Sequence, residues 1–319
     1  MDLNRERLKV FSGTANPALG QEICANLGVP LAQSLITRFS DGEVRVQIQE
    51  NVRGADVFVV QPTCNPVDTN LMELLLMMDA LKRASAKRIT PVIPYYGYSR
   101  QDRKDRPRVP ISSKVVADLL VTAGADRALT MDLHAPQIQG FFDIPLDHLY
   151  ASPILATHYK RKGIRNLAVV SPDVGGIRLA RAYAKRLEAD LVLIDKRRPR
   201  MNESEILNII GETKGKNVLI IDDLIDTGGT FTRAVEALRA NGASEVYGAC
   251  THPVLSGNAV ERIENSAVAR VTVTDTIPLK VRSQKIEVQS VSKLFAEAIT
   301  RSHLNKSISS LFDVDKDKI

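Results

Sequence analysis

The stretch NVLIIDDLIDTGGT, from Asn217 to Thr230, decides the fold of this chain. Its apolar run Val218 to Ile221 predicts a buried strand. An acidic pair, a loop of small residues and a helix expected over Phe231 to Asn241 follow that strand. A buried strand that leads through a short loop into a helix is typical of a mostly parallel sheet covered on both faces.

Similar short apolar runs alternate with amphipathic segments along most of the chain. Further strands are predicted at Asp56 to Gln61, Arg88 to Ile93 and Leu167 to Val170. One helix is predicted by apolar residues at helical spacing, namely Leu71, Leu74, Leu75, Met78 and Leu81, which we expect to be core residues. Alternating residues from Leu35 to Ile48 flank Asp41-Gly42 and predict a hairpin.

A weak internal repeat indicates two related halves. In each half a helix is followed by a Gly-Ala pair, a strand and a histidine, and the same spacing separates Gly124 from His134 and Gly242 from His252. We therefore expect two similar α/β domains, each a mostly parallel sheet flanked by helices. The expected N-terminal domain covers residues 1–149, the C-terminal domain covers 150–305, and a tail covers 306–319.

Composition limits the classes of partner. The chain has 319 residues, and its 43 Lys and Arg exceed its 37 Asp and Glu to give a net charge of +6, which favours an anionic ligand. We expect no nucleic-acid role, because the charges are interleaved and only 5% of residues are aromatic. The three cysteines show no metal-binding spacing, and no apolar run approaches the roughly 20 residues that cross a bilayer. A cytoplasmic protein without membrane contact is the simplest interpretation.

The loop in the opening stretch has the composition of a phosphate site. Backbone N–H groups from Asp226 to Thr230 can point at one phosphate, and Gly228 and Gly229 permit a close approach. Asp222 and Asp223, which we expect at the carboxyl end of the strand, could accept hydrogen bonds from ribose hydroxyls and order the water ligands of magnesium. The alternative is a solvated turn with two helix-capping residues.

This stretch resembles the phosphoribosyl-diphosphate binding loop shared by phosphoribosyltransferases and ribose-phosphate pyrophosphokinases. Other segments resemble the pyrophosphokinase family alone. They are FSDGE (Phe39 to Glu43), YYGYSRQDRK (Tyr95 to Lys104), LHAPQIQGFF (Leu133 to Phe142), SPDVGG (Ser171 to Gly176), KRRPR (Lys196 to Arg200) and SISSLF (Ser307 to Phe312). The similarity covers nearly the whole chain.

The resemblance implies two phosphoribosyltransferase-like domains and an enzyme that transfers the diphosphate of ATP to ribose 5-phosphate and releases AMP. It places ATP at Asp41, Gly42, Glu43, Arg100 and Gln101. It places ribose 5-phosphate at Asp222, Asp223, Asp226, Thr227, Gly228, Gly229 and Thr230. It further implies Mg²⁺ at His134 and Asp173, and a mobile catalytic loop with Lys196 and Arg198.

Several alternatives stay open at this point. His134 alone would more often be a structural histidine, since magnesium prefers oxygen ligands, and a short basic cluster such as Lys196 to Arg200 is commonly a solvated surface. The chain could instead be a phosphoribosyltransferase or a non-catalytic regulatory homologue.

The resemblance also implies a homohexamer, with the tail packed on the N-terminal half, and an effector site for phosphate or ADP near Arg106 to Arg108. Val109 stands where many family members have a glutamate, which puts the detail of that control in doubt.

Overall fold

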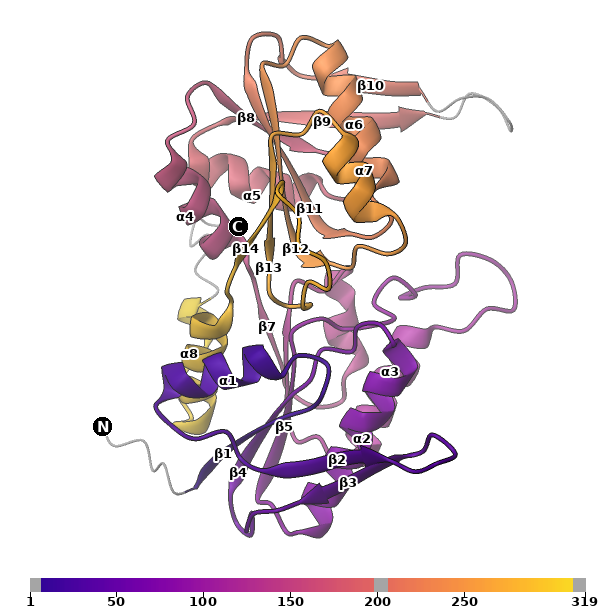
Figure 1. Cartoon of the computed structure of the whole chain (residues 1–319), viewed down its shortest axis with the longest axis vertical. Coiled ribbons are helices and arrows are strands. Elements are labelled where there is room, and N and C mark those ends of the chain that lie inside the picture. Colours follow the sequence, from indigo (N-terminus) through magenta and orange to yellow (C-terminus); the bar gives the residue numbers. More distant parts are fainter. Residues whose placement is uncertain (1–6, 198–205, 312–319) are drawn as a thin grey trace. The chain divides into compact units, whose positions relative to one another are not determined.

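A computed structural model of the chain describes residues 7–197 and 206–311, which form two compact units (Figure 1). The first unit contains the residues up to Tyr150, Thr276–Pro278 and the residues from Ser290 onward. The second contains Ala151–Asp275 and Leu279–Gln289. The last helix therefore belongs to the first unit, whereas the sequence-based division places it in the second domain.

The first unit is built on a parallel sheet in the order β1-β4-β5-β6-β7. Its strands are β1 (Leu8–Ser12), β4 (Asp56–Val60), β5 (Arg88–Ile93), β6 (Ala128–Met131) and β7 (Leu146–Leu149). Two helices cover each face: α1 (Pro17–Leu27) and α8 (Ser292–His303) lie on one side, and α2 (Val67–Arg83) and α3 (Ser112–Ala123) on the other (Figure 1). A 3₁₀ turn, η1 (Pro136–Phe141), precedes β7. The predicted α/β class is confirmed.

The helix predicted from apolar spacing is confirmed as α2. Its residues Leu74, Met78 and Leu81 are fully buried in the core of this unit and Leu71 is nearly so, whereas Leu75 is only partly buried and packs against the core. The methionine-rich stripe is thus a packing surface, as expected from its spacing.

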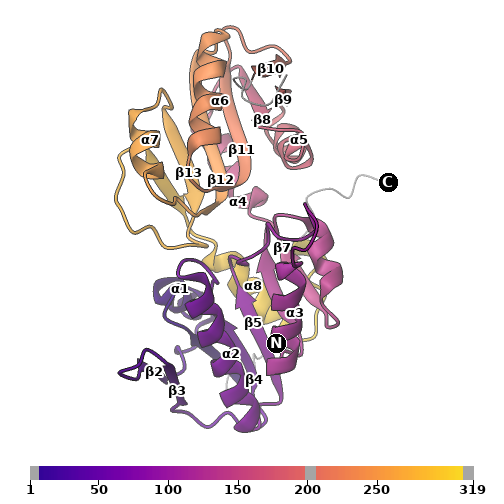
Figure 2. The same ribbon diagram turned by 90° about the vertical axis from the view of Figure 1, so that its right-hand side faces the viewer.

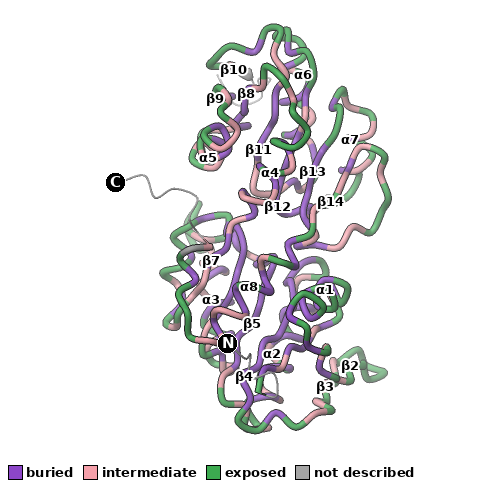
Figure 3. The backbone as a smooth tube through the Cα atoms, turned by 90° about the vertical axis from the view of Figure 1, so that its left-hand side faces the viewer, coloured by how far each residue is buried: buried purple, intermediate pink, exposed green. Residues whose placement is uncertain are grey.

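The predicted hairpin is also confirmed, with β2 (Ser34–Arg38) paired antiparallel to β3 (Val44–Ile48). Its connection is a five-residue loop rather than a two-residue turn, and Gly42 adopts a φ of 95° there. Ile36 and Val46 pack against the core, so the base of the hairpin is anchored to the unit. The tip is exposed, in contrast to the buried sheet strands (Figure 3).

Polar contacts fasten α8 to the amino edge of this sheet. Arg88 forms a bidentate pair with Asp56 and also donates to the carbonyl of Ser302 at 2.9 Å. The His303 imidazole lies 2.7 Å from the same aspartate. A segment from the end of the chain is thereby held on the N-terminal sheet, where Ile308 of the tail is also buried.

The second unit has a larger sheet in the order β10-β9-β8-β11-β12-β13-β14, parallel except between β9 and β10. Its strands are β8 (Leu167–Ser171), β9 (Asp190–Arg197), β10 (Ile206–Ile210), β11 (Asn217–Ile225), β12 (Glu245–Pro253), β13 (Arg270–Thr274) and β14 (Ile286–Gln289). Helices α4 (Ser152–Lys162) and α5 (Ile177–Leu187) cover one face, and α6 (Gly229–Ala240) and α7 (Ala259–Asn265) cover the other (Figure 2). A final 3₁₀ turn, η2 (Ser309–Leu311), follows α8 in the first unit.

Glu287 of the edge strand β14 fastens α4 to this sheet. Its carboxylate accepts hydrogen bonds from Lys162, from the Thr272 hydroxyl at 2.6 Å and from His158 at 2.8 Å. Burial by itself would raise the pKa of Glu287, but these hydrogen bonds outweigh it and lower the pKa to about 2. The carboxylate therefore stabilises the folded state while it is ionised.

Replacing Glu287 by glutamine should destabilise the protein at neutral pH by about 1–3 kcal/mol, because the charge-assisted hydrogen bonds are lost. The folded-state pKa is depressed, so this stabilisation is present above the unfolded-state pKa and disappears as the pH falls through the folded value near 2. Urea unfolding of both proteins between pH 7 and pH 2 measures the difference.

Glu188→Gln is the matched control, since that exposed carboxylate lies 3.7 Å from Lys160 and should contribute little. A difference between wild type and Glu287→Gln that stayed constant down to pH 2 would contradict the assigned hydrogen bonds.

Candidate active site

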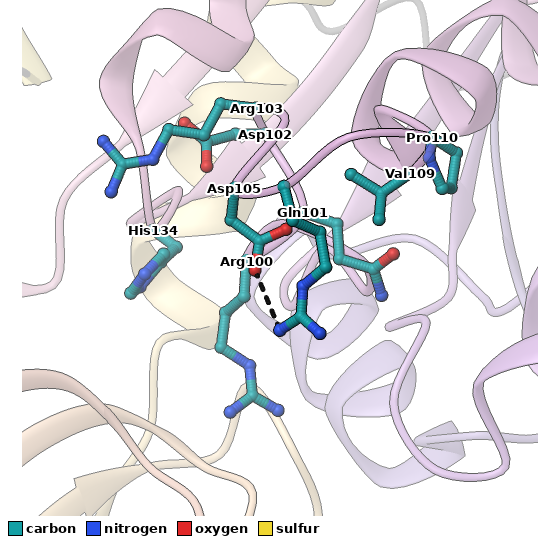
Figure 4. A pocket seen from close by; sticks show the side chains of 9 residues that line it. Arg100, Gln101, Asp102, Arg103, Asp105, Val109, Pro110 and His134 are labelled. Atoms are coloured by element: carbon teal, nitrogen blue, oxygen red, sulfur yellow. Dashed lines mark hydrogen bonds and ion pairs between the residues drawn. The ribbon is translucent and has the colours of Figure 1, made fainter. Parts of the chain in front are cut away.

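A cationic pocket of about 450 Å³ lies in the first unit, beyond the carboxyl end of β5 (Figure 4). Its lining includes three of the predicted site residues, Arg100, Gln101 and His134. The remaining lining comes from one loop and consists of Asp102, Arg103, Asp105, Arg106, Val109 and Pro110. The carboxyl ends of parallel strands are the usual position of ligand sites in such sheets.

Charge in the pocket is mixed but favours an anion. Three arginines line it, against the two carboxylates of Asp102 and Asp105. The guanidinium of Arg106 lies 3.5 Å from a carboxylate oxygen of Asp105 and partly neutralises its charge. Val109 belongs to the lining as well and contributes apolar surface.

The other predicted ATP residues lie elsewhere in the same unit. Asp41, Gly42 and Glu43 form the exposed tip of the β2–β3 hairpin, which is separate from the pocket loop in both Figure 1 and Figure 2. Asp41 accepts a hydrogen bond from the backbone N–H of Glu43 at 3.1 Å, which shapes the tip. Phe39, 52% exposed, lies under the guanidinium of Arg45. One chain therefore does not bring the two predicted ATP segments together.

In the second unit, the predicted phosphate loop has the geometry that anion binding requires. It leads from β11 through Asp226 and Thr227 into α6, and Gly228 adopts a φ of 75° at the helix start. A Cβ atom on Gly228 would be in ordinary contact with Ala259, at 3.4 Å from its carbonyl oxygen, so the backbone angle and not the space favours glycine. The N–H groups of the first turn of α6, at Gly229 and Thr230, have no acceptor within the helix and suit a phosphate.

The acidic pair lies inside β11, which corrects the expectation that it ends the strand. Pairing with β12 extends β11 to Ile225, and Asp222 lies opposite Cys250. Burial, then repulsion from Asp223 and from Asp173, raises the pKa of Asp222 well above its usual range. A bound cation would relieve this repulsion.

Asp173 lies in a compact loop after β8. Its Oδ1 atom accepts a hydrogen bond from the N–H of Gly176 at 2.9 Å, and the Ser171 hydroxyl donates to its carbonyl at 2.7 Å. The electrostatic influence of this carboxylate on Asp222 shows that the two predicted site residues belong to one cluster.

The predicted catalytic loop begins later than expected. Lys196 lies in β9 and pairs with Leu207 of β10, so the backbone at this position is a strand and not an irregular loop. Strand β10 was not predicted, and its antiparallel pairing extends β9 to Arg197. Arg198 lies outside the described residues.

Some contacting residues were not predicted. Asp102 and Asp105 line the pocket of the first unit, and in the second unit Arg262 of α7 donates to the carbonyl of Thr227 at 3.0 Å. Asp102 could have been noticed from its place inside the motif YYGYSRQDRK, and Asp105 directly follows that motif. Arg262 is far from the phosphate loop in sequence, and no motif marks it.

Magnesium fits the donor set of the second unit. Asp173, Asp222 and Asp223 offer carboxylate oxygens, which are the ligands this ion prefers. Among residues 7–197 and 206–311, no three histidine, cysteine or acidic side chains converge on a complete metal site. Mg²⁺ usually keeps waters and binds together with substrate phosphates, so an incomplete protein site is compatible with it.

Comparisons with known proteins agree with the geometry. A family model described as the N-terminal domain of ribose phosphate pyrophosphokinase matches residues 8–124, and one described as the phosphoribosyl synthetase-associated domain matches residues 193–313. A ribose-phosphate pyrophosphokinase of Ralstonia nicotianae is 57% identical over 97% of this chain and 99% of its own length. One of Wolinella succinogenes is 55% identical over 95% of this chain and 98% of its own length.

A solved structure gives the same result. The phosphoribosylpyrophosphate synthetase of Mycobacterium smegmatis superimposes with a TM-score of 0.89 at 42% identity, covering 94% of this chain and 99% of that one. The motifs, the fold and the similarity over nearly the full length all indicate the same family. The chain belongs to the ribose-phosphate pyrophosphokinase family.

Proposed function

We propose that the chain transfers the diphosphate group of ATP to the 1-hydroxyl of ribose 5-phosphate, giving 5-phosphoribosyl 1-diphosphate and AMP. The observation that carries the proposal is that one chain has both a phosphate loop before α6 and the cationic pocket around Arg100. A phosphoribosyltransferase needs the first feature and has no use for an ATP pocket. A regulatory homologue is disfavoured because the loop, the acidic pair and Asp173 are all present.

The reaction needs positioning and charge neutralisation more than a strong base. The sugar hydroxyl attacks the β-phosphorus of ATP, the bond between that phosphorus and the α–β bridging oxygen breaks, and AMP leaves. Backbone groups from Asp226 to Thr230 would hold the 5-phosphate, and Asp222 and Asp223 the ribose hydroxyls. Mg²⁺, for which the family resemblance implies Asp173 and His134 as binding residues, would supply a Lewis acid. Lys196 and Arg198 would stabilise charge that develops during transfer.

The ATP site also suggests that copies of the chain assemble. Because the hairpin tip and the pocket lie apart in one chain, we propose that the tip of one copy completes the pocket of another. Exposed apolar residues spaced by one helical turn support self-association, namely Met72 and Leu76 on α2 and Val115 and Leu119 on α3. A homohexamer is the assembly we propose, since closed symmetric assemblies are usual.

Control by phosphate or ADP and a cytoplasmic location stay predictions from the family resemblance. No helix within the described ranges is long and apolar enough to cross a membrane.

The first test is product analysis with the purified protein, ATP, magnesium and ribose 5-phosphate. AMP and the diphosphorylated sugar should form in equal amounts, and both should disappear when EDTA removes the magnesium. ADP as the sole nucleotide product would refute the proposed reaction and indicate an ordinary kinase.

Lys196→Ala should lower kcat by about 10²- to 10³-fold and leave the KM for ribose 5-phosphate nearly unchanged, because the lost interaction forms mainly in the transition state. Arg198→Ala should act similarly. Asp226→Ala is the contrasting variant and should raise that KM, since it alters the phosphate loop. Steady-state kinetics separates the two patterns, and a normal kcat in Lys196→Ala would show that the basic cluster is only a docking surface.

A shared ATP site predicts complementation between two defective variants. Asp41→Ala/Glu43→Ala would disable the hairpin tip and Arg100→Ala the pocket, so each should be nearly inactive alone. Coexpression in equal amounts should restore about one quarter of wild-type activity, because that fraction of sites would combine an intact tip with an intact pocket. If one chain formed the whole site, the mixture would stay as inactive as its components.

A further inference from the structure

The start of the pocket loop is fixed by hydrogen bonds to the rest of the first unit. Gln101 donates its backbone N–H to the carbonyl of Tyr98 at 2.9 Å and accepts from the N–H of Ser113 at 3.2 Å. Its side-chain Oε1 accepts from the hydroxyl of Ser112 at 2.6 Å. The next residue, Asp102, accepts from Nε2 of Gln137 at 2.6 Å.

These contacts determine what the two side chains offer to a ligand. Because Ser112 occupies Oε1 of Gln101, the amide presents its two Nε2 hydrogens, which donate to no described residue. Gln137 holds one carboxylate oxygen of Asp102. The pocket lining thus contains an oriented donor and an oriented acceptor, which extend to different sides of the loop (Figure 4).

The rest of the loop is held differently. The ion pair between Asp105 and Arg106 is local to the loop, and both side chains are largely exposed. The base of the loop is therefore fixed and its cationic tip is able to adapt to a ligand. This division suits a pocket that must hold one end of a nucleotide firmly while the phosphates change during reaction.

We propose that Ser112 and Gln137 are positioning residues of the nucleotide pocket. Ser112 fixes the amide of Gln101 so that Nε2 donates to an acceptor atom of ATP, and Gln137 fixes the carboxylate of Asp102 as a second polar group of the lining. This inference rests on the proposed function in one respect only, namely that ATP binds in this pocket.

A purely structural role for Ser112 explains less. Ser112 begins α3, yet its hydroxyl bonds to the Gln101 side chain, and the helix has no side-chain cap at Ile111. Gln101 is exposed, so a hydrogen bond to it contributes little to folding. The hydrogen bond instead restricts the Gln101 side chain before ATP binds, so less conformational entropy is lost on binding.

The test is calorimetric binding of ATP with magnesium and without ribose 5-phosphate, so that no turnover is needed. Ser112→Ala should weaken binding by about three- to tenfold, the effect of one ordinary hydrogen bond. Ser112→Thr, which keeps the hydroxyl, should bind nearly as well as wild type. Gln137→Leu should weaken binding to a similar degree.

The decisive measurement is a double-mutant cycle. In a Gln101→Ala background, Ser112→Ala should change the Kd by less than about twofold, because its partner is gone. Thr122→Ala is the matched control, since that hydroxyl lies on the same helix and bonds only to the carbonyl of Asp118. It should leave ATP binding unchanged.

Each outcome decides the matter. If Ser112→Ala has the same effect in both backgrounds, the hydroxyl acts through α3 and the inference is wrong. Failure of the wild-type protein to bind ATP overturns it as well. If ATP binds with the expected coupling but no AMP forms with ribose 5-phosphate, the proposed reaction fails while the positioning role stands.

Discussion

Parallel strand pairing determines where the candidate site residues of the second unit lie. In the second unit, β8, β11 and β12 run in the same direction, so their carboxyl ends reach one edge of the sheet. Each connection must then return over a face as a helix, and that helix starts at the same edge. The Asp173 loop is consequently brought by topology to the same edge as the acidic pair of β11 and the first turn of α6, although it is distant from them in sequence.

The same edge of the sheet has one part that favours an anion and another that disfavours negative charge. The start of α6 offers N–H groups that favour an anion, while repulsion within the acidic cluster disfavours further negative charge at Asp222. A sugar phosphate that carries hydroxyls toward the carboxylates and its phosphate toward the helix satisfies both demands. The separation of these two features along β11 and its loop therefore gives the ligand an orientation as well as an affinity.

Elements with strong local patterns could be predicted from the sequence. Helix α2 and strands β4 and β5 followed from apolar periodicity, and the hairpin from its alternation. The limits of β9 and β11 could not be predicted, because pairing with β10 and β12 extends them past the point where the apolar run stops. Likewise, the α8 sequence shows an amphipathic helix but not the Asp56–Arg88 pair that fastens it to the first unit. Long-range partners carry no local signal.

The same limit applies to the pocket, where motif and geometry contribute different information. The motif around Arg100 and Gln101 predicts nucleotide-binding residues, and only the folded chain shows that α3 and η1 fix the base of their loop. A motif indicates residues that contact a ligand, whereas the residues that orient them become their neighbours only when the chain folds. Pre-organisation of this kind reduces the entropy lost on binding. A fixed base with an adaptable cationic tip then reconciles selective binding of ATP with the charge redistribution that diphosphate transfer requires.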